Sequence, residues 1–239
     1  MIYNGDCMDY MELMEDEGVN LVFTDPPYGI GNEQKQIKHM NGMTRTVSEE
    51  WDVIKDFDQF TLNWLKESYR VLKPNGSMAI YASHHNLYLT GHIIQNILGM
   101  KILNNLCWYK RNSPPNVTCR MFTHSVEYII WAVKGKNWTF NYKDAKEING
   151  GKQQREVFDG TEFIESVMTP RKERVGHPTQ KPMDLTEYLI RILSNSGDLV
   201  FDPFMGSGTT GVAAEMLERE FVGCEKNDTF FSIAKERMG

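Results

Sequence analysis

The strongest constraint on the fold comes from residues 198–211, which read DLVFDPFMGSGTTG. A short apolar run is followed by an aspartate, a glycine-rich stretch and a helix-forming segment. This order predicts a buried strand, a tight turn and the N-terminus of a helix. Glycines at 206, 208 and 211 let the backbone approach a ligand and leave free amides of the helix N-terminus facing it. The segment therefore predicts a small-molecule site at the end of a strand.

Short apolar segments bounded by turn residues recur along the chain and predict further strands, at 21–24, 77–82 and 221–224. Amphipathic segments between them predict helices near 57–72, 86–98, 184–195, 209–218 and 228–238. This alternation predicts an α/β fold with a mainly parallel, twisted sheet and helices on both faces.

Two stretches interrupt the alternation, at 29–56 and 143–176, and we expect both to flank a substrate cleft. Between residues 101 and 142, hairpin-like runs with interleaved aromatics and lysines predict an inserted β-rich module. Residues 105–175 carry twelve Lys and Arg against eight Asp and Glu, whereas the whole chain has a net charge of −6. A basic stretch within an acidic chain suits a nucleic-acid surface, and a solvated loop region is the alternative.

The N-terminus carries acidic residues where a secretory signal needs basic ones, and no apolar run is long enough to span a membrane. A cytoplasmic protein with no membrane partner is expected. The spacings of the four cysteines form neither a Cys-x-x-Cys pair nor a zinc finger, so no metal is expected.

Two acidic residues narrow the ligand of the glycine turn. Asp202 would repel a pyrophosphate but suits the ammonium group of a methionine moiety. Glu225 ends the next apolar run, where an acidic side chain can accept hydrogen bonds from a ribose. Both favour an adenosine carrying a methionine moiety. The glycine spacing alone leaves a nicotinamide-dependent oxidoreductase as an alternative, and a binding protein without turnover as another.

A second motif, TDPPYG at 24–29, directly follows an apolar strand. Pro26 and Pro27 lack N–H donors and stiffen the segment, so that the Asp25 carboxylate and the Pro26 carbonyl can accept both hydrogens of an exocyclic amine. The Tyr28 ring offers a surface on which a base can stack. These residues predict an amine-methylating site, in which a duplex base must first be flipped out of its stack.

Several motifs together resemble those of the β class of DNA amino-methyltransferases. They occur in the family's order: NGDCMDYM at 4–11, TDPPY, HPTQKP at 177–182, DPFMGSGTT and FVGCE at 221–225. The resemblance covers nearly the whole chain. It implies a Rossmann-like class I methyltransferase fold, with S-adenosylmethionine as the cofactor.

The resemblance also implies roles for particular residues. Asp6 and Cys7 would border the cofactor's adenine, while Thr179, Gln180 and Lys181 would lie near its methionine carboxylate. The expected cofactor site is completed by Asp202, Pro203, Phe204, Gly206, Ser207, Gly208, Thr209 and Glu225. The expected catalytic residues are Asp25, Pro26, Pro27 and Tyr28.

By the same resemblance the chain is a site-specific DNA methyltransferase acting on the N6 amine of adenine, since the family pairs DPPY with adenine and SPPY with cytosine N4. Cytosine N4 methylation and RNA adenine methylation stay open as alternatives. Residues 1–104 and 176–239 would form the catalytic domain and 105–175 an inserted target-recognition region. Expected partners are DNA, a second copy of the chain and a cognate restriction endonuclease. Candidate phosphate contacts are Lys110, Arg111, Arg120, Lys134, Lys136 and Arg155.

Overall fold

A computed structural model describes residues 1–30, 54–111, 113, 115–116, 119–159 and 180–239. It also describes the backbone of two short antiparallel strands, β3 (Lys35–Lys38) and β4 (Thr44–Val47). Much of the two stretches expected to flank the cleft therefore lies outside the described residues, as does Thr179.

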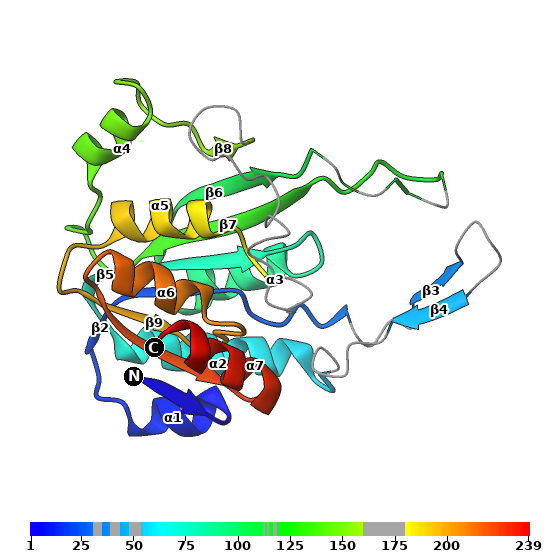
Figure 1. The fold of residues 1–239 in the computed structure, drawn as a ribbon, viewed down its shortest axis with the longest axis horizontal. Coiled ribbons are helices and arrows are strands. Elements are labelled where there is room, and N and C mark those ends of the chain that lie inside the picture. Colours follow the sequence, from blue (N-terminus) through cyan, green and yellow to red (C-terminus); the bar gives the residue numbers. More distant parts are fainter. Residues whose placement is uncertain are drawn as a thin grey trace.

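The described core is one eight-stranded sheet with helices on both faces (Figure 1). The strands β1, β10, β9, β2 and β5 run parallel, β7 is antiparallel to both its neighbours, and β8 pairs in parallel with β6. The predicted α/β fold with a mainly parallel sheet is confirmed. In spatial order the strands are β1 (Ile2–Asn4), β10 (Glu220–Glu225), β9 (Leu199–Asp202), β2 (Val19–Thr24), β5 (Leu72–Ala82), β7 (Val126–Val133), β6 (Lys101–Tyr109) and β8 (Val157–Phe158).

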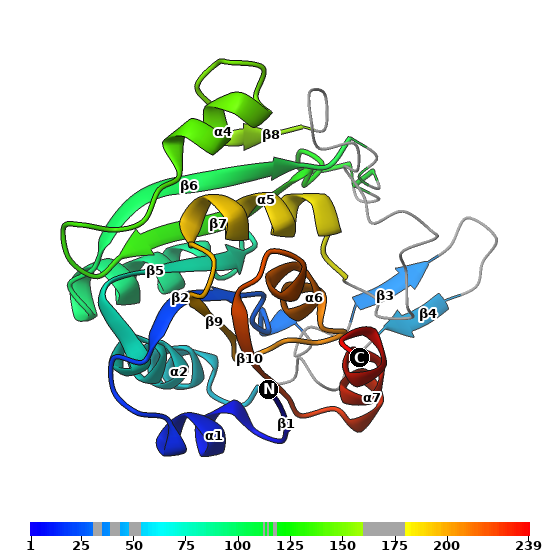
Figure 2. The same ribbon diagram turned by 60° about the vertical axis from the view of Figure 1, so that its left-hand side comes forward.

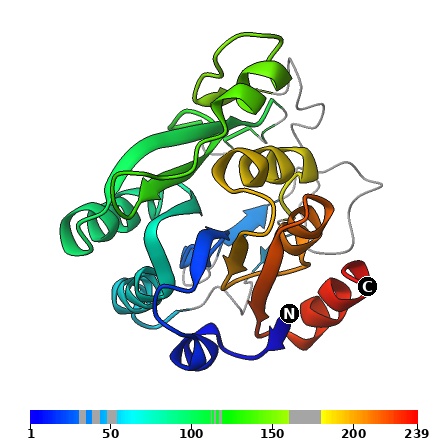
Figure 3. The same ribbon diagram turned by 90° about the vertical axis from the view of Figure 1, so that its left-hand side faces the viewer.

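Apolar side chains of the central strands alternate between the two faces, as the period of a strand requires. Leu21 and Phe23 of β2 face one core and Val22 faces the other. Val19 also faces the second core, because the register of β2 shifts between Val19 and Leu21. The second core is covered by α1 (Cys7–Leu13), α2 (Phe57–Val71), α3 (Leu87–His92) and the π-helical turn Ile93–Ile97. The first is covered by α4 (Tyr142–Ile148), α5 (Met183–Leu193), α6 (Thr209–Met216) and α7 (Asp228–Arg237). Figure 3 shows the sheet between these two layers.

The connections on either side of β2 and β9 run in opposite directions along the sheet. From β2 the chain passes through α2 to β5, whereas from β9 it passes through α6 to β10 on the other side. Such a reversal opens a crevice at the carboxyl ends of the two strands, where open α/β sheets bind their ligands. Asp25 follows β2, and the glycine turn follows β9, so the fold brings both motifs to this crevice.

The predicted β-rich module at 101–142 is wrong in one respect. Its two strands pair antiparallel as predicted, but β7 also pairs with β5, from Ser77 opposite Val133 to Ala82 opposite Tyr128. Both strands are therefore part of the main sheet, because the buried residues of β7 continue the cores on both faces. The boundary expected at residue 105 falls inside β6.

Most helices and strands lie close to their expected positions, with local differences. The helix expected near 57–72 ends at Val71, and β5 begins directly at Leu72, five residues before the strand expected at 77–82. The helix α4 and the strand β8 lie in a stretch that was expected to be irregular. The hairpin tip between β6 and β7 projects on the same side as β3 and β4 (Figures 1 and 2). In the part of the chain that is described, every helix is too short or too polar to cross a membrane.

Candidate active site

The first motif leaves the carboxyl end of β2. Thr24, the last residue of that strand, is fully buried and donates a hydrogen bond from its hydroxyl to Asp202 Oδ1 on β9, at 2.6 Å. This bond joins the ends of the two strands that border the crevice. It fixes where the next residue, Asp25, leaves the sheet.

Both oxygens of the Asp25 carboxylate have a partner. The Tyr28 hydroxyl donates to Oδ1 at 2.7 Å, and the Lys181 ammonium lies 2.6 Å from Oδ2. Burial raises the pKa of Asp25 above its usual value, and Lys181 and Tyr28 offset only part of that rise. The Asp25 side chain is still 24% exposed to the crevice.

The residues after Asp25 are held rigidly. Pro26 is buried, and Pro27 and Tyr28 are half-buried. Gly29 has φ +71°, and a Cβ there would come within 2.5 Å of the Phe57 ring. The turn therefore packs against the start of α2 and needs a glycine at this position.

Lys181, which the sequence places near the methionine carboxylate of a cofactor, contacts two carboxylates of the protein. Its ammonium is shared between Asp25 Oδ2 at 2.6 Å and Glu127 Oε2 at 3.3 Å. It also lies over the rings of Tyr81 and Tyr28, at 5.0 and 5.6 Å. Burial lowers the pKa of Lys181, but the two carboxylates outweigh burial and the net shift is upward. Lys181 thus belongs to the same charged cluster as Asp25 and Glu127.

Glu127 near the start of β7 is a site residue that the motifs missed. Its Oε1 pairs with Lys110, at the end of β6, and its Oε2 faces Lys181. Burial raises the pKa of Glu127, yet the ammonium groups of Lys181 and Lys110 hold it below its usual value. The signal for it was an acidic residue at the start of an otherwise apolar strand, since a buried carboxylate needs a cationic partner.

Asp202 does not present a free carboxylate to a ligand. It is only 3% exposed and accepts hydrogen bonds from the hydroxyls of Thr24 and Thr210, each at 2.6 Å, and from the Phe204 amide at 3.1 Å. Burial raises its pKa to about 7. Its evident role is to anchor the glycine turn to the ends of β2 and β9.

Glu225 at the end of β10 grips the same turn. Its Oε2 accepts from the Gly206 amide at 2.9 Å and its Oε1 from the Asn227 amide at 2.7 Å. Gly206 has φ +51°, in the left-handed region that favours glycine. Each carboxylate oxygen retains a lone pair for a further donor, so Glu225 can both shape the turn and accept from a hydroxyl.

The later glycines serve packing as well as the turn. A Cβ on Gly211 would collide with Met238 and approach the Phe221 ring to 2.7 Å, while one on Gly208 would lie 3.0 Å from Ala234. Arg237, which the motifs missed, donates to the Ser207 carbonyl at 2.6 Å. The expectation that Gly211 faces a ligand is therefore wrong, because it packs α6 against β10 and Met238.

The N-terminal motif lies at the end of β1, next to β10. Asp6 caps α1 by accepting from the Met8 amide at 3.0 Å, and its other oxygen lies 3.0 Å from Lys226. Cys7 is 4% exposed, and burial raises the pKa of its thiol to about 12, so it stays protonated. The capping role of Asp6 explains why α1 begins here.

These residues suit a nucleoside that carries an amino acid. Glu225 ends β10 and Asp6 follows the neighbouring parallel strand β1 by two residues, and both carboxylates can accept from hydroxyl or amino groups. Phe204 supplies an apolar surface and is itself held by Phe60 and Trp64, with ring centroids 5.9 and 5.4 Å apart. Of the other predicted cofactor residues, Pro203, Ser207 and Thr209 are buried in the turn and Gln180 precedes Lys181.

The predicted phosphate contacts lie at both ends of the strands: some lie at the carboxyl ends of the parallel strands, where Asp25 lies, and some lie at the opposite ends. Lys110 follows β6 at the edge that holds Asp25, Arg111 lies 3.9 Å from Asp159, and Arg120 and Arg155 are exposed. Lys134 and Lys136 follow β7 at the opposite edge.

Lys134 Nζ donates to the carbonyls of Leu72 and Tyr69, at 2.8 and 3.2 Å, and the Lys136 amide donates to the Asn75 side chain. These contacts give Lys134 and Lys136 a structural part between the end of α2 and the start of β5, at the opposite ends of the strands from the crevice.

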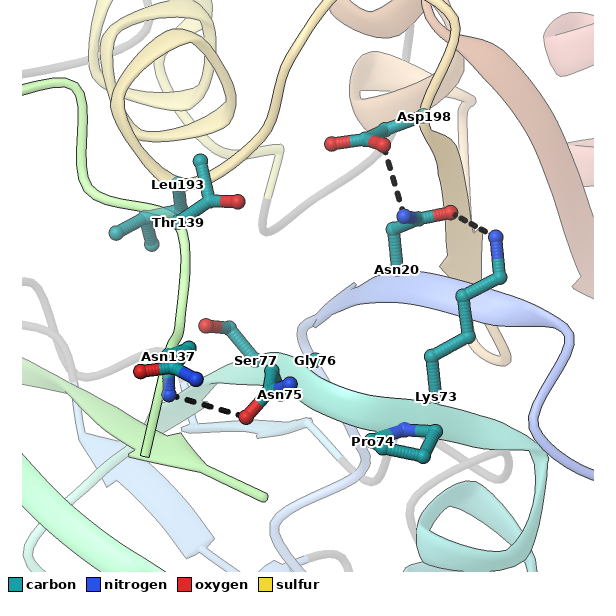
Figure 4. Close-up of a pocket in the computed structure, with 10 residues that line it drawn as sticks. All are labelled: Asn20, Lys73, Pro74, Asn75, Gly76, Ser77, Asn137, Thr139, Leu193 and Asp198. Carbon is teal, nitrogen blue, oxygen red and sulfur yellow. Dashed lines mark hydrogen bonds between the residues drawn. The ribbon is translucent and has the colours of Figure 1, made fainter. Parts of the chain in front are cut away.

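A small pocket of about 130 Å³ lies at that opposite edge as well (Figure 4). There Asn20 donates to Asp198 at 2.8 Å and accepts from Lys73 at 2.8 Å and from the Leu199 amide at 3.1 Å. These polar groups satisfy one another. The pocket joins the beginnings of the strands and is separate from the site at their ends.

A protein-family model and two known proteins match most or all of the chain. The family model described as "DNA methylase" matches residues 19–236. The chain is 38% identical over 247 residues to type II methyltransferase M2.DpnII of Streptococcus pneumoniae, covering 100% of this chain and 89% of the relative. It is 37% identical over 242 residues to type II methyltransferase M2.MboI of Moraxella bovis, covering 99% and 86%.

Solved structures agree with the fold. The crystal structure of the M1.HpyAVI–SAM complex superposes with a TM-score of 0.71 at 28% identity, over 100% of this chain and 98% of that one. The cytosine-N4-specific PvuII DNA methyltransferase superposes with a TM-score of 0.75 at 21% identity, over 100% and 86%. The second likeness concerns the fold alone.

Proposed function

Because the chain belongs to the DNA methylase family, whose members use S-adenosylmethionine, we propose that it methylates the N6 amine of adenine at specific sites in DNA. It is a DNA methyltransferase, and S-adenosylmethionine is its methyl donor. The choice of adenine over cytosine is the part that needs support from the site itself.

The observation that carries the adenine assignment is Asp25 in DPPY, since the family pairs DPPY with adenine and SPPY with cytosine N4. Asp25 directly follows β2, across the switch point from the glycine turn after β9. A carboxylate and the carbonyl of Pro26 are acceptors only, and together they suit the two hydrogens of an exocyclic amine. Hydrogen bonds to both N–H groups favour a pyramidal nitrogen, whose lone pair is then less delocalised into the ring. Tyr28 offers its ring to the base and its hydroxyl to Asp25.

The cofactor side would be formed by the turn of 203–208 with Glu225 and Asp6, at the ends of β9, β10 and β1. When bound, S-adenosylmethionine supplies an electrophilic methyl group on a positively charged sulfur. The residues of this chain would position the reacting groups: Glu225 and Asp202 hold the turn, and Asp25 would hold the amine so that it faces the turn. Overall the amine nitrogen gains a methyl group and loses one proton.

The target-recognition role falls to residues 105–175 in this proposal. The tip of the β6–β7 hairpin exposes Phe122 to 96%, next to Arg120, and Lys110 and Arg111 lie at its base. Cationic side chains at this edge suit phosphates, and an exposed aromatic side chain suits contact with bases. Because β6 and β7 are strands of the main sheet, the recognition surface would be fixed rigidly to the catalytic core.

Partners beyond DNA belong to the proposal as well. The type II methyltransferases among the relatives make a cognate restriction endonuclease a reasonable partner. A homodimer would extend a recognition region that is short for a chain of this family. A cytoplasmic location follows from DNA as the substrate.

The test is to incubate the protein with methyl-labelled S-adenosylmethionine and duplex DNA, digest the DNA and identify the labelled nucleoside. The proposal expects N6-methyladenosine in its deoxy form. Label in N4-methyldeoxycytidine would reject the adenine assignment while leaving the family intact. Parallel incubation with RNA of the same sequence should give no label.

A further inference from the structure

Two carboxylates face each other across one ammonium beside the proposed base site. Lys181 Nζ lies 2.6 Å from Asp25 Oδ2 and 3.3 Å from Glu127 Oε2. The three side chains come from the turn after β2, from the segment before α5 and from β7. Lys110 neutralises the far oxygen of Glu127, so two cations balance two anions.

This arrangement conflicts with the task of Asp25. Its Oδ1 accepts from Tyr28 and its Oδ2 from Lys181, so an incoming amine would share Oδ2 with a charged donor that weakens it as an acceptor. Positive charge also develops on the amine nitrogen as the methyl group is transferred. An ammonium held against Asp25 opposes that charge, and the opposition weakens as the ammonium moves away.

Glu127 offers the ammonium another place. Its Oε2 is buried and already pairs with Lys181 at 3.3 Å, a longer contact than the 2.6 Å between the same ammonium and Asp25 Oδ2. The rings of Tyr81 and Tyr28 flank Lys181 and can stabilise its charge in both positions. A small shift of Nζ would complete the bond to Glu127 and free Asp25.

We propose that Glu127 is a positioning residue for methyl transfer, which takes the Lys181 ammonium from Asp25 when the target amine binds. The inference rests on the proposed function only in requiring that the acceptor be an exocyclic amine held by Asp25. It applies equally to adenine and cytosine.

The charged groups that face Asp25 should make the pH profiles of two variants shift in opposite directions. Tyr28 faces it from its own turn, Lys181 from before α5, Glu127 from β7, Tyr81 from β5 and Asp202 from β9. The negative charge of Glu127 raises the pKa of Asp25, and the positive charge of Lys181 lowers it. Removing either charge should therefore move the pH profile of methylation in a definite direction.

The experiment compares Glu127→Gln, Glu127→Asp and Lys181→Met with the wild type, counting methyl groups transferred to DNA on whichever base receives them. For Glu127→Gln we expect kcat to fall at least about tenfold, as when a positioned acid or base is disturbed. S-adenosylmethionine affinity, measured by calorimetry, should stay within about twofold. The acidic limb of the pH profile of Glu127→Gln should move to lower pH, whereas that of Lys181→Met should move to higher pH.

Glu127→Asp keeps the charge and should recover part of the lost kcat. Glu187→Gln neutralises an ion-paired carboxylate on α5, away from the crevice, and serves as the matched control with unchanged kinetics. Wild-type kcat and an unmoved limb in Glu127→Gln would overturn the inference. So would equal losses in Glu127→Gln and Glu127→Asp, because loss of packing alone would explain them. Label on cytosine would reject the adenine assignment without affecting this outcome.

Discussion

The Lys181 ammonium lies 2.6 Å from Asp25 Oδ2. This ion pair joins the HPTQKP and DPPY segments in one charged cluster. The cofactor turn after β9 is held by a different set of groups, centred on Asp202 and Glu225. The crevice thus holds two separate clusters, one around Asp25 and one around the glycine turn, and substitutions in the two clusters should have separable effects.

Asp25→Asn should lower turnover by at least about a hundredfold while leaving S-adenosylmethionine binding nearly unchanged. The amide keeps the shape of the carboxylate, but its NH₂ group would face the amine hydrogens, and transition-state positioning would be lost. Steady-state methylation and calorimetry measure the two effects. Asp16→Asn, at an exposed ion pair with Arg70, is the control. Substantial turnover by Asp25→Asn would remove this carboxylate from the mechanism.

Tyr28→Phe should shift the acidic limb of the pH profile to higher pH. The hydroxyl stabilises the ionised form of Asp25 through a 2.7 Å hydrogen bond, and its loss leaves burial to raise the pKa of Asp25 further. The phenyl ring still offers a stacking surface, so KM for DNA should change little. Tyr28→Ala, which removes the ring as well, should raise KM. An unmoved limb in Tyr28→Phe would show that this hydrogen bond does not tune Asp25.

Asp202 should make stability depend on pH. Burial raises its pKa from 3.8 to about 7, so between these values the folded protein holds a proton that the unfolded chain has lost. Its contribution to the free energy of unfolding therefore falls as pH rises from about 4 to about 7, and is constant above that. At about 1.4 kcal/mol per pKa unit the change is of the order of 4 kcal/mol.

The measurement for Asp202 is urea unfolding of the wild type and of Asp202→Asn across this range. The free energy of unfolding of the wild type should fall relative to that of Asp202→Asn as pH rises to about 7, because the amide of the variant cannot ionise. A difference that stays constant over the range would contradict the raised pKa.

Gly211→Ala should destabilise the protein by about 1–3 kcal/mol, the cost of overpacking a core. The added methyl group would meet Met238 and the Phe221 ring. Gly91→Ala is a matched control, since Gly91 is also helical and, among the described residues, a Cβ there would meet only Ile102, at 3.9 Å. There, the higher helix propensity of alanine should make the change neutral or stabilising by up to about 1 kcal/mol. Thermal or urea unfolding tests both, and equal stability of the two variants would reject the packing role.

Lys134→Met and Arg120→Ala should separate folding from DNA binding. Lys134 bonds the carbonyls of Leu72 and Tyr69 near the end of α2, so its loss should cost about 1–3 kcal/mol of stability without changing the salt dependence of DNA affinity. Arg120→Ala should leave stability intact and reduce the slope of log affinity against log salt by about 1. The reverse pattern would contradict the structural role given to Lys134 and the DNA-binding role given to Arg120.

The sequence was sufficient for the framework because its signals are local. The apolar runs ending at Thr24 and Asp202 predicted the two strands that border the crevice, and the strand order then brings their motifs together. The hairpin runs of β6 and β7 were visible too, but their pairing with β5 depends on contacts between distant segments, which periodicity does not contain.

The same limit applies within the site. Lys181 was recognised as a site residue, but its partner Glu127 lies in no motif and reaches it only through the tertiary fold. The helix-capping role of Asp6 and the packing of Gly211 were hidden for a related reason. A motif shows which residues occur together, and it does not distinguish contact with a ligand from support of the turn that makes the contact.

The most direct test of the central claim is modification mapping of genomic DNA from a host that expresses the wild type or Asp25→Asn. The account predicts N6-methyladenine at every copy of one short recurring sequence with the wild type, and none of it with the variant. Methylation of cytosine N4 instead, methylated adenines without a shared surrounding sequence, or full adenine methylation by Asp25→Asn would contradict it.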